Sequence, residues 1–289
     1  MNFFKILFSP ITAPIRFIQH NFKATLLVII IISIYQNSDP QTILKPNLQI
    51  INLKGAINDP SEILSHIKQA KDNKNIKGVL LVVNSPGGAV APSVEISYAI
   101  KELNHIKPVI AYASGTMASG SYYSSIWAKK IVANPGSMIG SIGVIMQSVD
   151  TSNLLSKIGV KTQTIKMGKY KEVGTPTRPW TQYEKKELHK VIKNTYNMFV
   201  KDVATARKLK IADQTKFADA HIFTASQAKK VGLIDQVITI NGAKKLLEKE
   251  ANIKNPIWKK EDKLDKFLKQ ILQNSFSNIL SNFNGLMAY

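Results

Sequence analysis

The sequence predicts an α/β fold built from parallel strands and crossover helices, and two observations lead to this prediction. Residues 78–83 are a continuous apolar run of strand length, which is typical of a strand buried on both faces of a sheet. Strand, turn and helix patterns then alternate along the chain, as they do in parallel sheets. The chain has 289 residues, 44% of them hydrophobic, and no long linker between its apolar runs, so a single core is the simplest arrangement.

In the first half of the domain, apolar and turn-forming residues place each element in order. A strand at 48–53 follows a polar spacer and ends at Gly55. Asp59 and Pro60 then open a helix whose apolar residues fall on one face. After the strand at 78–83, the pattern predicts a turn at 85–88, a helix near 93–103, a strand at 108–111, a turn rich in glycine and serine, and a helix from about Ser119.

The second half contains short strands, one long helix and a loop. The sequence predicts strands at 131–133, 142–146, 160–165 and 233–237, a long helix at 182–208, and a capped helix at 224–232. Residues 167–179, which include Lys171, have glycine or proline on both sides and no apolar period, so a loop is expected there. Residues 264–283 keep a helical apolar period, which fits a helix docked on the body or on a partner and leaves lipid association open.

The N-terminal sequence has the pattern of a membrane signal. An apolar run at 24–35 has no acidic residue before it, and the first acid is Asp39. Four basic side chains precede the run, namely Lys5, Arg16, His20 and Lys23. This asymmetry places the N-terminus in the cytoplasm and everything after about Asp39 outside it. A cleaved secretory signal is the rival interpretation, but residues 34–38 lack a small-x-small cleavage pattern, so we expect an uncleaved, single-pass transmembrane helix.

The chain is strongly basic and has no cysteine. There are 39 Lys and Arg residues against 19 Asp and Glu residues, which gives a net charge of +20. The lysines are spread along helix-like segments, so a solvated basic surface is the first interpretation. Attraction to anionic lipid is the second, and nucleic acid is a distant third because no binding motif accompanies the charge. The absence of cysteine excludes disulfides, thiolate catalysis and cysteine-ligated metals.

Ser119 is the candidate nucleophile. It lies among small residues, where the pattern changes from strand and turn to helix, and Gly120 follows it. Taken alone, such a serine is better explained as a helix N-cap. A helix N-terminus, however, directs amide N–H groups at the place where a tetrahedral oxyanion would form, so the amide of Gly120 is a natural donor.

A second donor is expected in the segment 84–88, which reads Asn-Ser-Pro-Gly-Gly. This segment follows the strand at 78–83, at the strand end where ligands usually bind in α/β sheets. As a lone motif it is a tight turn. Two consecutive glycines also let the backbone approach a substrate closely, so the amide of Gly88 is the second candidate oxyanion donor.

A serine nucleophile needs a base, and histidine is the usual one. Four of the five histidines precede the predicted anchor or fall in lysine-rich helices, and His221 remains a candidate without an acidic partner. A lysine serves instead when its amine is neutral. Lys171 has the aromatic Tyr170 beside it, although the residues alone describe an exposed loop lysine.

Five motifs carry a resemblance to a known family. They are residues 84–88, Met117-Ala118-Ser119-Gly120 with Tyr122-Tyr123, Gly140-Ser141-Ile142-Gly143-Val144, Gly168-Lys169-Tyr170-Lys171, and the segment from Phe223-Thr224 to Gly232-Leu233-Ile234-Asp235. With them, the stretch from about Leu48 to Ile240 resembles the signal peptide peptidase A family of bacterial membrane serine proteases, in its short, single-domain form. The resemblance implies the ββα-superhelix fold of the caseinolytic (Clp) protease and the crotonases.

The resemblance also implies roles for single residues. Ser119 matches the nucleophile, Lys171 the general base and Ser141 the serine that orients this lysine, while Gly88 and Gly120 take the oxyanion positions. It implies no metal or other cofactor. It further implies a ring-like homo-oligomer in which Ser119 of one subunit meets Lys171 of the next. The chain departs from the family pattern at Ser121, where a second glycine usually follows Ser-Gly.

These observations divide the chain into a cytoplasmic segment at 1–23, a membrane anchor at 24–38, a spacer at 39–47, a protease domain at 48–252 and an amphipathic helical tail at 253–289. The expected function is a Ser-Lys endopeptidase of the bacterial cytoplasmic membrane that degrades signal peptide remnants and other hydrophobic peptides on the periplasmic side. The alternatives are a protease that trims a membrane protein partner, as stomatin-associated proteases do, a crotonase-like enzyme that acts on acyl-coenzyme A, and a catalytically silent scaffold. Nucleic acid is not an expected partner.

Overall fold

The computed structural model describes residues 20–36 and 45–259, in two compact units that divide between Lys45 and Pro46. In the first unit, a run of apolar residues forms helix α2 (Phe22–Gln36). Within the described ranges, no helix combines the length and the apolar character needed to cross a bilayer. The transmembrane helix predicted at 24–38 is therefore not found in the structure, and its last two residues lie outside the described ranges.

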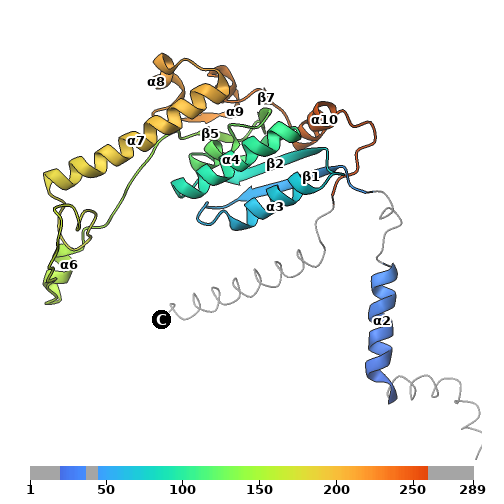
Figure 1. Cartoon of the computed structure of the whole chain (residues 1–289), viewed down its shortest axis with the longest axis horizontal. Helices are drawn as coiled ribbons and strands as arrows, with labels where there is room; N and C mark the ends of the chain where they lie inside the picture. The colour runs from blue at the N-terminus through green and yellow to red at the C-terminus, as the bar shows by residue number, and fades with distance from the viewer. Residues whose placement is uncertain (1–19, 37–44, 260–289) are drawn as a thin grey trace, which may run out of the picture. The chain divides into compact units, whose positions relative to one another are not determined.

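The second unit is a mixed α/β domain with one seven-stranded sheet (Figure 1). Its elements, in chain order, are β1 (Leu48–Lys54), α3 (Ser61–Asp72), β2 (Gly78–Ser85), α4 (Val90–Ile106), β3 (Val109–Ala118), α5 (Gly120–Ser125), β4 (Lys130–Ala133), β5 (Met138–Gly140), α6 (Ser152–Lys157), α7 (Gln182–Arg207), η2 (Ile211–Asp213), α8 (Gln214–Phe217), β6 (Ile222–Thr224), α9 (Ala225–Lys230), β7 (Gln236–Val237) and α10 (Ile240–Glu250).

Parallel pairing dominates this sheet. The strands β1, β2, β3, β4 and β7 lie side by side in this order and are parallel, and β5 runs parallel to the second half of β3. β6 pairs with β5 in the antiparallel direction. Helices α3 and α4 connect successive parallel strands, because a parallel pair needs a crossover connection between its strands. The predicted α/β class with parallel strands and crossover helices is confirmed.

Apolar side chains bury both faces of the sheet. On one face, Ile67 of α3 and Ile100 of α4 pack in a cluster with Leu81 of β2. On the other face, Leu247 of α10 packs in a cluster with Leu80. Alternate residues of β2 therefore serve two cores, which explains the continuous apolar run in its sequence.

Several boundaries differ from the prediction. β3 continues through the segment rich in glycine and serine that the sequence marks as a turn, and the side chain of Asn84 accepts a hydrogen bond from Thr116 N at 3.0 Å there. Residues 142–146 and 160–165 do not form strands, and β5 lies earlier, at 138–140. The strand predicted at 233–237 is reduced to its last two residues, which form β7.

The long helix predicted at 182–208 is confirmed as α7. It begins in a capping box, in which Thr181 and Glu184 satisfy each other's backbone donors. Its last third packs on the core through Phe199 and Val203. The capped helix predicted at 224–232 is α9, whose N-cap Thr224 accepts a hydrogen bond from Gln227 N.

The first and the last described residues of the second unit lie side by side at the start of β1. Asn47 N and Leu48 N donate to Ile257 O at 2.8 and 3.1 Å, and Lys259 N donates to Leu48 O at 2.7 Å. The described part of the predicted tail, residues 253–259, therefore runs beside the start of β1. Residues 260–289, and with them the predicted tail helix, lie outside the described residues.

Candidate active site

Ser119 lies at a strained turn between β3 and α5. Its backbone angles are φ 52° and ψ −125°, a conformation that residues other than glycine rarely adopt. Ser119 N donates to Gly140 O at 2.8 Å, and Tyr123 N donates to Ser119 O at 3.0 Å. The serine side chain makes no capping hydrogen bond to α5. The turn thus resembles a nucleophile elbow, which projects a serine hydroxyl away from the backbone.

The glycine pair after β2 packs directly against this turn. A Cβ atom on Gly87 would lie 2.6 Å from Gly120 N and 2.9 Å from Ser119 Cβ. A Cβ atom on Gly88 would lie 2.2 Å from the carbonyl oxygen of Ile57. Both positions therefore require glycine, and the hydrogen bond from Ile57 N to Gly87 O, 2.9 Å long, fixes the loop.

The amides of Gly88 and Gly120 are close together and unpaired. A Cβ atom on Gly120 would lie 3.3 Å from Gly88 N. Across residues 45–259, neither amide donates a hydrogen bond to another group, whereas Gly87 N donates to Ser85 Oγ at 3.2 Å. Two free N–H groups beside a serine match what an oxyanion hole requires.

Ser121 connects the two halves of this site. Its side chain is fully buried. Its hydroxyl accepts a hydrogen bond from Ala118 N at 2.9 Å and donates one to Ser85 O at 2.7 Å. The Ser121 side chain, which stands where the resemblance leads one to expect a glycine, therefore joins the end of β3 to the end of β2. Because its hydroxyl is buried and hydrogen-bonded, it does not compete with the hydroxyl of Ser119.

A small apolar pocket opens beside Ser119. Its volume is about 30 Å³, which is enough for a group of methyl or water size. Val90 and Val94 of α4 line one side, and Met198 and Phe199 of α7 line another. The pocket therefore fits a small, apolar side chain.

Tyr123 fixes α7 over this pocket. Its ring meets Phe199 edge to face, with centroids 4.9 Å apart, and its hydroxyl donates a hydrogen bond to the Asp202 carboxylate. Burial first, and then the hydrogen bond to Asp202, raise the pKa of Tyr123, so its phenol stays a neutral donor.

Ser141 follows β5 on the other side of the turn. Its neighbour Gly140 accepts the hydrogen bond from Ser119 N, and Ser141 N donates to His221 O at 2.7 Å. Among the residues that the structure covers, the Ser141 hydroxyl has no hydrogen-bond partner, so it is available to a further group. His221 is exposed, and its ring leans on Phe223 with centroids 6.0 Å apart.

Lys171 lies at the far end of α7 from the pocket. It is exposed, and the ring of Tyr170 beside it packs edge-on against Tyr183 in the first turn of α7, with centroids 5.7 Å apart. From Tyr183 to Thr195, which lines the pocket, the helix rises about 18 Å. Within one copy of the chain, the structure therefore does not bring Lys171 to Ser119.

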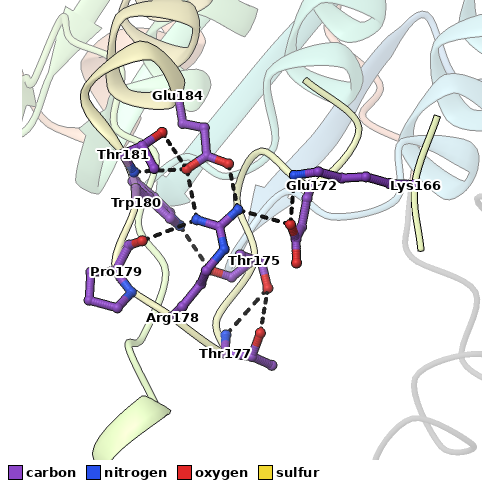
Figure 2. A network of polar contacts seen from close by, with 9 residues as sticks. All are labelled: Lys166, Glu172, Thr175, Thr177, Arg178, Pro179, Trp180, Thr181 and Glu184. Carbon is purple, nitrogen blue, oxygen red and sulfur yellow. Dashed lines mark hydrogen bonds and ion pairs between the residues drawn. The ribbon is translucent and has the colours of Figure 1, made fainter. Parts of the chain in front are cut away.

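A polar network holds residues 166–178, which we call the Lys171 segment, on the start of α7 (Figure 2). Arg178 makes two hydrogen bonds, of 2.9 and 2.8 Å, to the buried Glu184 and one of 2.9 Å to Glu172, which Lys166 also contacts at 2.8 Å. The hydrogen bonds from Arg178 and Thr181 lower the pKa of Glu184 to about 2, and those from Lys166 and Arg178 do the same for the pKa of Glu172.

The structure thus gathers Ser119, Gly88 and Gly120 with the backbone of Ser141, and leaves Lys171 apart. The wall of the pocket on α7 was not found by sequence reasoning. The apolar spacing of Phe199 and Val203 indicates only that this part of α7 is buried, and it does not show which site the buried face meets.

With this geometry, the molecule belongs to the α/β proteins that carry a serine on a strained strand-to-helix turn beside two free backbone amides. Comparison with known sequences gives the family. The sequence profile of peptidase family S49 matches residues 101–254, more than half of the chain, and the chain belongs to this family. The resemblance to signal peptide peptidase A read from the motifs is confirmed.

Individual relatives agree with this assignment. A protease of Methanocaldococcus jannaschii is 45% identical over 198 residues, which cover 68% of this chain and 64% of that protein. A protein of Enterococcus faecium named signal peptide peptidase SppA is 36% identical, with 66% and 56% covered, and a protease of Synechocystis is 35% identical, with 67% and 70% covered. The match spans less than two thirds of the length of the first two relatives.

Proposed function

We propose that this chain is a membrane-attached serine endopeptidase that cleaves hydrophobic peptides, such as the remnants of signal peptides, through a Ser-Lys dyad. The observation that carries the proposal is the pair of free amides, on Gly88 and Gly120, beside the strained Ser119. Family membership and the protease names of the relatives support the reaction class. The family resemblance also favours the ββα-superhelix type of fold.

The chemistry proceeds in two steps. The Ser119 hydroxyl attacks the peptide carbonyl carbon, its proton passes to a base, and the two amides donate hydrogen bonds to the oxyanion that forms. The peptide C–N bond then breaks, the base returns the proton to the leaving amine, and an acyl-enzyme remains on Ser119. A water molecule, deprotonated by the same base, hydrolyses this ester.

Lys171 of a second copy of the chain is the proposed base. Two observations support a second copy. Lys171 lies too far along α7 to reach Ser119 of its own chain. The part of the chain between β5 and α7, which includes Lys171, also exposes large apolar side chains. Ile145 is 87% exposed, Ile165 104% and Met167 92%, as is typical of surfaces that bind a partner. The homo-oligomer covers these side chains and removes the lysine amine from water, while Ser141 orients it.

The substrate class follows from the pocket and the N-terminal sequence. The pocket beside Ser119 is small and mostly apolar, which suits the small and hydrophobic side chains of signal peptides. The basic residues before the apolar run at 24–35 favour attachment to the bacterial cytoplasmic membrane with the catalytic unit on the periplasmic side.

Substitutions in the dyad test the proposal. Purified full chain is assayed for hydrolysis of a fluorogenic hydrophobic peptide and for covalent labelling by an activated phosphonate. Ser119→Ala should abolish both, and Lys171→Ala should abolish hydrolysis, because the two groups act as one unit. Lys169→Ala is the matched control, since it removes a neighbouring lysine, and it should stay active. Activity retained by Lys171→Ala would reject the dyad, and an unlabelled Ser119 would favour a scaffold.

A further inference from the structure

Five lysines gather at the edge of the sheet where the parallel strands begin. They lie on three segments: the turn before β2, the last turn of α10, and the stretch that follows α10. We call them the basic edge, and its members are Lys74, Lys77, Lys249, Lys254 and Lys259. All five are exposed.

Backbone contacts bring these segments together. Lys77 N donates to Asn47 O at 2.7 Å, and Lys259 N donates to Leu48 O at 2.7 Å. The side chain of Asn47 donates to Asn255 O at 2.9 Å, directly beside Lys254. The entry to β1 therefore forms the centre of the basic edge, with the C-terminal end of α10 beside it (Figure 1).

The positive charge of this edge is only partly neutralised within the described chain. None of its five lysines forms an ion pair in residues 45–259, and two nearby acids pair with lysines outside the edge. Glu250 pairs with Lys129 at 2.6 Å and Asp72 pairs with Lys68 at 2.6 Å, whereas Glu248, which accepts a hydrogen bond from the neutral indole of Trp258, offsets one of the five positive charges. The edge therefore presents a concentrated positive field to its surroundings.

The basic edge is separate from the candidate active site. Ser119 and Gly88 follow the carboxyl ends of β3 and β2, whereas the basic edge surrounds the amino ends of the same parallel sheet. A partner bound at the basic edge would leave the catalytic turn open to peptides.

We infer that the basic edge rests on a bilayer and binds the headgroups of anionic phospholipids. The short connection between the basic edge and the apolar N-terminal segment supports a bilayer as the partner, and this step rests on the proposed membrane attachment. Only ten residues, 37–46, separate α2 from Asn47 in the sequence, so the edge is covalently tied to the apolar N-terminal segment by a short connection. Lysines near an anionic membrane surface each strengthen binding roughly five-fold at low salt.

Trp258 adds a second observation. It lies beside Leu48 at this edge, half-buried, and Lys244 Nζ is 5.4 Å from its ring centroid. Tryptophan is enriched at the level of lipid headgroups because its ring is amphipathic. A bilayer is thus favoured over nucleic acid as the occupant.

The absence of cysteine makes the test direct, since a single introduced cysteine is the only labelling site. The full chain carries Asn255→Cys at the basic edge or, as the reference position near the opposite edge, Glu95→Cys, each bearing an environment-sensitive fluorophore. The proteins are mixed with phosphatidylcholine vesicles that contain or lack phosphatidylglycerol. We expect phosphatidylglycerol to protect the fluorophore on the Asn255→Cys chain from a water-soluble quencher. The fluorophore on the Glu95→Cys chain should stay accessible to the quencher, and high salt should reverse the protection.

Charge variants provide the control. The triple variant Lys77→Gln, Lys249→Gln and Lys254→Gln should lower the apparent affinity for anionic vesicles by up to about 100-fold, as read from the protection of the fluorophore. Lys185→Gln, Lys193→Gln and Lys201→Gln remove the same charge from α7 and should change little. Equal protection in both kinds of vesicle, equal behaviour of the two triple variants, or stronger protection by duplex DNA than by anionic vesicles would overturn the inference. Flotation with neutral vesicles tests the membrane attachment separately, and peptide hydrolysis tests the proposed function.

Discussion

At the scale of single residues, Ser121 shows how one buried hydroxyl holds two loops in register. It accepts from Ala118 N and donates to Ser85 O, so it joins the strand that carries Ser119 to the strand that carries the glycine pair. The sequence marks Ser121 only as a departure from a family pattern. Its role depends on contacts to residues 36 positions away, which no local pattern contains.

Ser121→Ala should therefore loosen the catalytic turn as well as destabilise the fold. It leaves a buried N–H and a buried carbonyl unpaired, which costs about 1–3 kcal/mol of unfolding free energy. Misplacing the turn should also slow phosphonate labelling of Ser119 about ten-fold or more. Ser125→Ala is the matched control, because Ser125 is equally buried and its hydroxyl donates only to Ser121 O of its own helix. If both variants label at the wild-type rate while folded, Ser121 has only a structural role.

Gly88→Ala tests the second amide. The added methyl group would lie 2.2 Å from Ile57 O and 2.5 Å from Ile57 N, so the loop must shift and carry its N–H out of position. Loss of one oxyanion donor lowers turnover about 10²–10³-fold, and overpacking costs about 1–3 kcal/mol of stability. Gly136→Ala is the control, since its nearest neighbour would be 3.5 Å away. Peptide turnover and thermal unfolding are measured for both, and an unchanged turnover in Gly88→Ala would remove this amide from the site.

At the scale of elements, the sequence was most reliable where the partner of a segment lies within the same chain. The strand at 78–83 and the long helix α7 are predicted because their apolar residues pack in the core. Residues 142–146 have the same apolar character, yet Ile145 is exposed and the segment forms no strand. Hydrophobic periodicity indicates that one face of a segment packs against other protein. It does not show whether that protein is the same chain or a second one.

In β3 the sequence predicts a turn where the structure has a strand. Residues 113–117 have the composition of a turn, but they continue the strand because the side chain of Asn84 supplies a partner to Thr116 N and β5 supplies the ladder beyond. For the site, sequence predicts Ser119 and both glycines from local pattern. It does not predict the strain at Ser119 or the pocket wall on α7, since both arise from long-range packing.

The network at the start of α7 predicts acid sensitivity of the Lys171 segment. Because Arg178 holds the pKa of Glu184 at about 2, below its ordinary value of 4.5, the charged carboxylate stabilises the native segment fully above about pH 4.5. This stabilisation is lost as the pH falls from about 4.5 to 2. Trp180, which donates to Thr175 O beside the network, reports the change by fluorescence in a variant that keeps it as the sole tryptophan.

Glu184→Gln should weaken this transition and leave only the part that comes from Glu172, whose pKa the same network lowers, because glutamine keeps the shape of the Glu184 side chain without a charge to titrate. Glu187→Gln is the control, as its partner Lys190 is an exposed neighbour on the same helix. A Trp180 signal that stays constant down to about pH 2 in the parent, or titrates identically in Glu184→Gln, would show that the network does not hold the segment.

At the scale of the whole molecule, the separation of Ser119 from Lys171 along α7 predicts that two inactive variants restore each other. In a mixture of Ser119→Ala and Lys171→Ala subunits, some interfaces pair the intact serine of one variant with the intact lysine of the other. Random assembly makes about one quarter of the interfaces complete in this way. Peptide hydrolysis should then return to about a quarter of the wild-type rate after the variants are unfolded and refolded together, and stay absent when each is refolded alone.

The matched control refolds Ser119→Ala with a chain that carries both substitutions. This mixture assembles equally well, yet no interface in it contains the intact serine, so it should stay inactive. Restoration in the first mixture and not in the second requires a site shared between copies, because no single chain in the first mixture holds both groups. If neither mixture recovers activity while the Lys169→Ala chain refolds to full activity, the serine and the lysine must act within one chain, and α7 would have to bend to bring them together.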